Sequence, residues 1–183
     1  LADVVRGSTA AFESYDHTKA LELAEHFFWK FTDDYLELVK DRAYNANGEV
    51  SAAQQASAAI TLRRALHTML RLFAPFLPFA TDEVWSWWQQ GSVHLSPWPV
   101  TEEINFQNAG LMKVASEALV QIRKSKSDAK LSMKAEIKTA TLSGAQELSL
   151  IAEDLKSVGK IADLKLLIGN ELELSDLEFA SEE

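Results

Sequence analysis

Hydrophobic residues recur at helical spacing through the first part of the chain. Between residues 16 and 44 the steps alternate between three and four residues, at Leu21, Ala24, Phe28, Phe31, Tyr35 and Leu38. This stripe is typical of a helix packed against other helices. Similar stripes predict helices over residues 1–14, over residues 51–73, and from near Gly110 through Ile122 and beyond.

Proline and turn residues punctuate this pattern. Pro75 and Pro78 are expected to end the third helix. Thr81 then has the right chemistry to cap a short helix, because its side chain can accept a hydrogen bond from a free N–H of the first turn. That helix carries Trp85, Trp87 and Trp88. Core packing is the favoured role for its tryptophans, with base stacking as the alternative and Trp87 the least certain.

The periodicity changes after about residue 130. Residues 136–142 are predicted to form a strand and residues 145–157 a helix. Residues 161–168 and 171–179 are predicted to form a hairpin, joined at Gly169-Asn170. We therefore expect a mainly α protein: a helical bundle over residues 1–108, followed over residues 109–183 by a long helix and a small α/β appendage.

The composition is that of a globular protein, with 47% hydrophobic and 25% charged residues. A formal net charge of −9 argues against a general nucleic-acid-binding protein. The chain has no cysteine, which excludes disulfides and suits a reducing, cytoplasmic location. No apolar run reaches the roughly 18 residues that cross a bilayer, so no membrane partner is expected. The chain does not begin with Met, which suggests a piece of a longer polypeptide.

No motif predicts catalysis. The four histidines are scattered, and glycine-rich phosphate loops and nucleophile elbows are absent. Asp33, Glu37 and Asp41 share one helix face, which a solvated surface explains. We expect no catalytic residue, metal site or cofactor within the chain itself.

One stretch departs from the acidic average. Residues 121–138 carry a local charge of +4, and their basic members are Arg123, Lys124, Lys126, Lys130, Lys134 and Lys138. Favourable charge at a helix C-terminus explains the first of these, whereas contact with phosphate would explain those beyond the helix end. The residues alone leave both interpretations open.

Several segments resemble the C-terminal region of valyl-tRNA synthetases, which are class I aminoacyl-tRNA synthetases. They include Pro75-Phe76-Leu77-Pro78-Phe79 with Glu83-Val84-Trp85, and His94-Leu95 with Pro97-Trp98-Pro99. These segments occur in the family's order and spacing, and further matches lie at residues 15–22 and 27–44. The resemblance covers most of residues 1–130, and the last fifty residues match less clearly.

The resemblance implies a helical anticodon-binding domain, which a further helix precedes in the family. It implies a parent enzyme that activates valine with ATP and esterifies it to tRNA. The catalytic signatures of that enzyme, His-Ile-Gly-His and Lys-Met-Ser-Lys-Ser, are absent from this chain. ATP is therefore expected only in the catalytic domain of the parent. The implied partners are valine-accepting tRNA and the catalytic and editing domains of the same polypeptide.

A tRNA-binding set follows from the resemblance and the basic run: Arg123, Lys124, Lys126, Lys130, Lys134, Lys40, Arg42 and Tyr44. The first five would contact backbone phosphates. The last three, at the end of the second helix, would face the anticodon loop, although a solvated helix terminus explains them equally well. Two alternatives remain: the same domain of an isoleucine-type synthetase, and a helical module that binds protein rather than RNA.

Overall fold

The structure is a computed structural model that describes residues 1–46, 48, 50–101, 108 and 110–180. The chain forms two compact units. The first, here called the helical unit, comprises Leu1–Asp33 and Ala52–Asn105; the second, the mixed unit, comprises Asp34–Ser51 and Phe106–Glu183. Residues 34–51 therefore group with the C-terminal part of the chain, whereas a division by sequence alone places them in the bundle.

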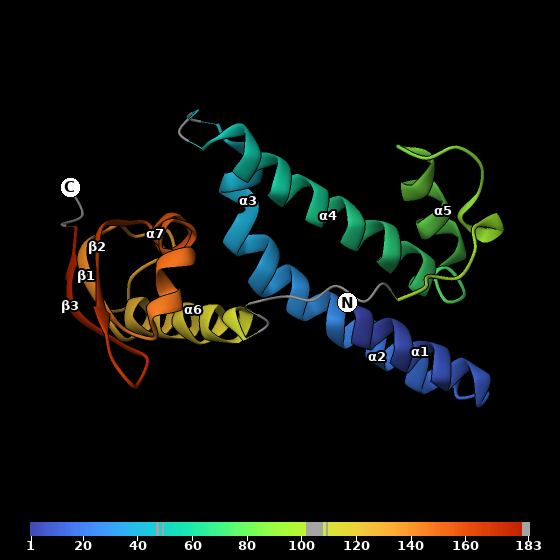
Figure 1. Ribbon diagram of the computed structural model, residues 1–183, viewed down its shortest axis with the longest axis horizontal. Coiled ribbons are helices and arrows are strands. Elements are labelled where there is room, and N and C mark those ends of the chain that lie inside the picture. The colour runs from blue at the N-terminus through green and yellow to red at the C-terminus, as the bar shows by residue number, and fades with distance from the viewer. Residues whose placement is uncertain (47, 49, 102–107, 109, 181–183) are drawn as a thin grey trace. The chain divides into compact units, whose positions relative to one another are not determined.

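The helical unit follows the predicted stripes closely. Its elements are α1 (Ala2–Glu13), α2 (His17–Lys30), α4 (Ala52–Phe73), α5 (Pro78–Ser86) and the short 3₁₀ helix η2 (Val93–Leu95). Helix α1 lies along α2, and α4 contacts both α2 and α5 (Figure 1). Asp16 caps α2 as its side chain accepts a hydrogen bond from the Lys19 amide at 2.9 Å.

Two hydrophobic clusters hold the helical unit together. The first joins α1, α2 and α4 through Val4, Val5, Ala24 and Leu72, with Trp98 packed against it. The second joins α4, α5 and η2 through Leu70, Ala74, Trp85 and Val93. Trp85 is buried, and the Trp98 indole donates a hydrogen bond to the Thr9 hydroxyl at 2.9 Å. Core packing is thus confirmed for Trp85, and Trp98 also packs against the core.

The predicted cap of α5 is wrong. The helix begins at Pro78, whose fixed φ and missing N–H suit the first helical position. Thr81 consequently lies inside the helix, where its buried hydroxyl donates back to the Leu77 carbonyl at 2.8 Å. Asp82 instead accepts hydrogen bonds from Ser92 and Val93, at 2.6 and 3.0 Å, which fix the η2 loop against α5.

The second predicted helix is not a single α-helix. Between α2 and α3 (Glu37–Tyr44) the backbone adopts a π-helix, η1, over Phe31–Leu36. Helix α3 then ends at Asn45, which has a left-handed conformation with φ of 47°. The apolar spacing continues through this region, so the sequence pattern alone gave no sign of the wider turn.

The mixed unit contains a three-stranded sheet with helices on one face (Figure 1). Its elements after α3 are α6 (Leu111–Asp128), β1 (Ile137–Gly144), η3 (Gln146–Leu150), α7 (Ala152–Gly159), β2 (Ile161–Ile168) and β3 (Glu173–Phe179). Ile137 and Leu142 of β1, Leu119 and Ile122 of α6, and Leu155 of α7 are all buried. The mainly α fold with an α/β appendage is confirmed.

The predicted hairpin of β2 and β3 is wrong. The sheet order is β2-β1-β3, so β1 separates the two strands; β1 pairs in parallel with β2 and antiparallel with β3. A side chain of α6 explains the crossing. The Gln121 amide donates to the Leu172 carbonyl and accepts from the Leu174 amide, both at 2.8 Å. These two bonds hold the start of β3 at the far edge of β1.

Candidate nucleic-acid interface

Lys126 is buried rather than part of the protein surface. Only 1% of the residue is exposed, and its ammonium donates hydrogen bonds to the carbonyls of Met133 and Gly159, at 3.0 and 2.8 Å. Burial lowers the pKa of Lys126, and the nearby charge of Lys160 lowers it further. An ammonium enclosed in this way cannot reach a phosphate. The prediction that Lys126 contacts tRNA is therefore corrected to a structural role.

Arg123 and Lys124 face different surroundings on α6. The Arg123 guanidinium lies 3.9 Å from the Asp34 carboxylate, which also accepts a hydrogen bond from Ser116 at 2.8 Å. Asp34 is mostly buried, so this contact ties α6 to the first residue of the mixed unit. Lys124 is exposed. Of the two, Lys124 is therefore the one whose charge remains available to a ligand.

The remaining basic residues lie beyond the end of α6. Lys130, Lys134 and Lys138 are exposed, and Lys160 joins them as an exposed lysine directly after α7. Among the residues that the structure describes, no ion pair engages these four side chains. Lys160 is not in the predicted set, because it is isolated in sequence from the basic run. Its proximity to Lys126 arises only from the fold.

The three residues predicted at the end of the second helix occupy different settings. The Lys40 ammonium pairs with Glu37 at 2.5 Å. The Arg42 guanidinium pairs with Asp154 of α7 at 3.2 Å, and both side chains are largely buried. Tyr44 is 80% exposed. Arg42 therefore joins two helices of the mixed unit, and only Tyr44 presents most of its side chain to solvent.

Two opposing effects act on the carboxylate of the Arg42–Asp154 pair. Burial raises the pKa of Asp154, and the positive charge of Arg42 opposes that rise. The Ser157 hydroxyl of α7 also donates to Asp41, at 2.5 Å. Two polar contacts therefore fix α7 against α3, with Arg42 supplying the charge that the buried carboxylate requires.

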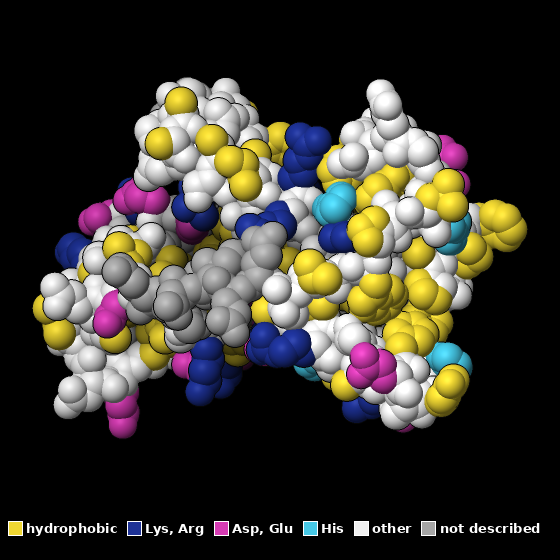
Figure 2. Space-filling model, turned by 45° about the vertical axis from the view of Figure 1, so that its right-hand side comes forward, with side chains coloured by type: hydrophobic (Ala, Val, Ile, Leu, Met, Phe, Trp, Pro, Cys, Tyr) yellow, Lys and Arg dark blue, Asp and Glu magenta, His cyan; other side chains and the backbone are white. Residues whose placement is uncertain are grey.

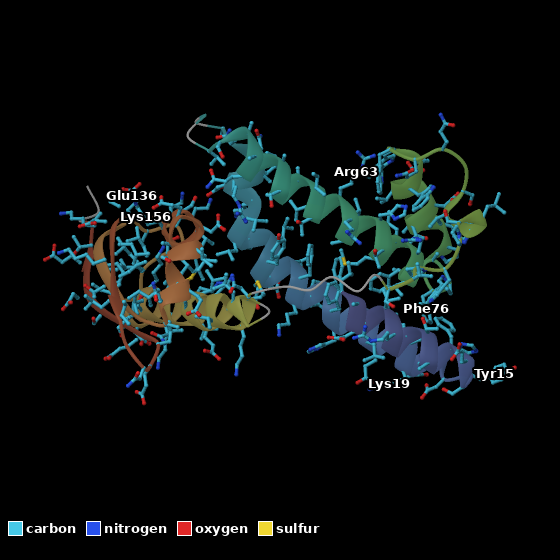
Figure 3. The ribbon with its side chains drawn as sticks, viewed as in Figure 1. Tyr15, Lys19, Arg63, Phe76, Glu136 and Lys156 are labelled. Atoms are coloured by element: carbon cyan, nitrogen blue, oxygen red, sulfur yellow. The ribbon has the colours of Figure 1, made fainter. Side chains whose placement is uncertain are left out.

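A second polar cluster, absent from the predicted set, lies between α4 and α5. His67 stacks on Trp85 with ring centroids 4.9 Å apart, and Arg63 extends from α4 over the ring of Trp88 at 5.2 Å (Figure 3). Arg71 donates to the carbonyls of His67 and Pro97, at 3.1 and 3.2 Å. Arg63 and Arg71 are thus engaged with the fold rather than being merely solvated charges on a helix face.

This cluster predicts a pH dependence of stability. Burial, then the charges of Arg71 and Arg63, lower the pKa of His67 below its ordinary value of 6.5. His67 therefore binds a proton more readily in the unfolded chain than in the folded chain. The free energy of unfolding should consequently decrease as the pH drops below 6.5. We expect the midpoint of urea unfolding, followed by tryptophan fluorescence, to decrease from pH 7.5 to 5.5. The decrease should be smaller in His67→Gln; an identical pH profile for both proteins would contradict this assignment.

Two further kinds of site were sought in the described part of the chain. Its His, Asp and Glu side chains include no group of three that could hold a metal ion. Its helices include none with the length and apolar character needed to span a membrane.

The chain is similar along its whole length to known proteins. Residues 1–141 match a family model described as the anticodon-binding domain of tRNA ligase. The valine–tRNA ligases of Thermobifida fusca and Leifsonia xyli are each 46% identical to this chain, over 100% and 97% of its length. The Bifidobacterium longum enzyme is 42% identical over 100% of it. The chain spans only about a fifth of these relatives, 21 to 22% of their length. The chain belongs to the family of tRNA ligase anticodon-binding domains.

Proposed function

We propose that this chain is the tRNA-binding part of a valine–tRNA ligase. The observation that carries the proposal is the family match over residues 1–141, together with valine–tRNA ligases as relatives along the whole chain. The exposed Lys124, Lys130 and Lys134 support it, because exposed cations can contact backbone phosphates. Discrimination among tRNAs would come from unpaired anticodon bases, which can stack and form hydrogen bonds.

The chemistry of the proposed parent enzyme would take place elsewhere. In it, a catalytic domain would bind ATP, activate valine and transfer it to tRNA, and an editing domain would accompany it. This chain contains neither of the two catalytic signatures of that enzyme class. Its role would be to bind and orient the tRNA, and such an enzyme would work in the cytoplasm. The isoleucine-type alternative is less favoured, since valine–tRNA ligases are the relatives described above.

An NMR titration tests the proposal directly. The isotope-labelled chain is titrated with an RNA stem-loop that carries a valine anticodon, and in parallel with the same stem and a scrambled loop. We expect tighter binding of the valine loop, with chemical-shift changes at Tyr44 and at the exposed lysines of the mixed unit. Equal affinity for both RNAs would contradict anticodon recognition. A third titration uses the same stem with an isoleucine anticodon, and tighter binding of that loop would favour the alternative synthetase.

A cluster of exposed hydrophobic side chains favours a second role for the helical unit. Leu77, Phe79 and Leu95 are 53, 89 and 88% exposed, and a hydrogen bond at 3.0 Å from His94 to the Pro78 carbonyl brings η2 beside the start of α5. Figure 2 shows hydrophobic side chains and histidines close together on this part of the molecule. Such a patch suits contact with another protein surface. We propose the catalytic part of the parent enzyme as that surface, in addition to RNA binding.

A further inference from the structure

The buried ammonium of Lys126 joins two segments that are distant in sequence. Its bonds to the Met133 and Gly159 carbonyls place these two oxygens within about 6 Å of each other. The Ile137 amide adds a third connection, because it donates to the Lys160 carbonyl at 2.9 Å. The loop after α6, the end of α7 and the start of β1 therefore meet around a single side chain.

Two exposed lysines flank this junction. Lys134 directly follows Met133, and Lys160 directly follows Gly159, so the backbone of each is fixed beside a carbonyl that Lys126 binds. Lys160 has a left-handed backbone conformation, with φ of 51°, and its amide donates to the Ser157 carbonyl at 3.1 Å. The two side chains thus emerge from backbone positions that are close together and well anchored.

We propose that Lys134 and Lys160 form a paired contact for the phosphate backbone of RNA, and that Lys126 is the positioning residue that holds them together. The inference rests on the proposed tRNA-binding function and adds Lys160 to its contact set. It also gives Lys126 a role in binding without any contact of its own.

Charge at a helix terminus does not account for this arrangement. Helix α7 ends at Gly159, and its carbonyl, which carries part of the negative end of the helix dipole, is already bound by the Lys126 ammonium. In the part of the chain that the structure describes, neither Lys134 nor Lys160 enters an ion pair. Glu136, the acidic residue closest to Lys134 in sequence, is itself exposed. Both lysines are exposed, so their charges are available to a polyanion.

The test measures RNA affinity across a salt series for Lys134→Gln, Lys160→Gln and the double variant. Each phosphate contact contributes about 0.7 to 0.9 to the slope of log K against log salt. We expect each single variant to reduce the slope by nearly 1, and the double variant by nearly 2. Lys165→Gln removes an exposed lysine of β2 in the same unit and is the matched control. Its slope should equal that of the unmodified chain.

Lys126→Met separates positioning from simple stabilisation. If Lys126 positions the pair, the folded variant should lose as much slope as the double variant, although it removes no phosphate contact. If Lys126 is only structural, the variant loses stability and keeps the full slope. A Lys160→Gln variant that binds like Lys165→Gln would overturn the paired contact while leaving the proposed function intact. Absence of RNA binding by the unmodified chain would overturn the proposed function, and this inference with it.

Discussion

Replacement of Arg42 by methionine is expected to lower the free energy of unfolding of the mixed unit by about 3 kcal/mol. The guanidinium lies 3.2 Å from the Asp154 carboxylate, and the two side chains are only 26 and 10% exposed. Without Arg42, a buried carboxylate would have no cation beside it, and this is the costly outcome for a buried pair. All five tryptophans lie in the helical unit, so hydrogen exchange of the β1 amides in urea is the suitable measurement.

The pH dependence gives this prediction a second signature. Loss of Arg42 should raise the pKa of Asp154 further, since burial already raises it and the opposing charge is gone. A carboxyl whose pKa is raised in the folded state contributes to the free energy of unfolding at low pH. That contribution is lost as the pH increases through the raised pKa. The stability deficit of Arg42→Met should therefore be smaller at pH 4 than at pH 7.

Two comparisons distinguish a structural role of Arg42 from contact with tRNA. Lys40→Met removes a more exposed cation from the same helix and should change stability by about 0.5 kcal/mol or less. The double variant Arg42→Met/Asp154→Leu removes both charges and should recover most of the lost stability. If the double variant then binds RNA like the unmodified chain, Arg42 acts only through α7. Equal stability of Arg42→Met and Lys40→Met would contradict the importance of the pair.

The helices of this protein were predictable because local periodicity determines them. The apolar stripe of α6 also indicates that Lys126 is buried, although Lys126 was predicted to be a surface residue. Leu119 and Ile122 face the core, and Lys126 continues that stripe one turn further along the helix. Its charge led to its assignment to the surface. A lysine on the apolar stripe of a helix is better interpreted as a buried donor whose acceptors lie elsewhere in the chain.

Two of the incorrect predictions have non-local causes. Gly169-Asn170 is a sound local signal for a hairpin, but Gln121, about fifty positions earlier, binds the backbone of Leu172 and Leu174 and holds β3 at the other edge of β1. Similarly, the pairing of Arg42 with Asp154 joins residues more than a hundred positions apart. No pattern in one segment encodes such contacts, so the sequence alone could not separate Arg42 from the exposed residues of the proposed binding set.

Replacement of Lys126 by methionine is expected to destabilise the mixed unit by about 2 to 3 kcal/mol. Methionine retains most of the alkyl chain in the buried site but leaves the Met133 and Gly159 carbonyls without their donor, and a buried unsatisfied carbonyl costs about 1 to 3 kcal/mol. The expected sum is below the full value for two buried carbonyls, because Met133 is 49% exposed and its carbonyl can turn to water, and because removal of a buried charge returns part of the cost. Hydrogen exchange of the β1 amides again provides the measurement.

Lys124→Met, at an exposed position on the same helix, is the control and should change the free energy of unfolding by less than about 0.5 kcal/mol. Equal protection in the two variants would mean that the ammonium contributes nothing to the junction, and the convergence of three segments on Lys126 would then need another cause.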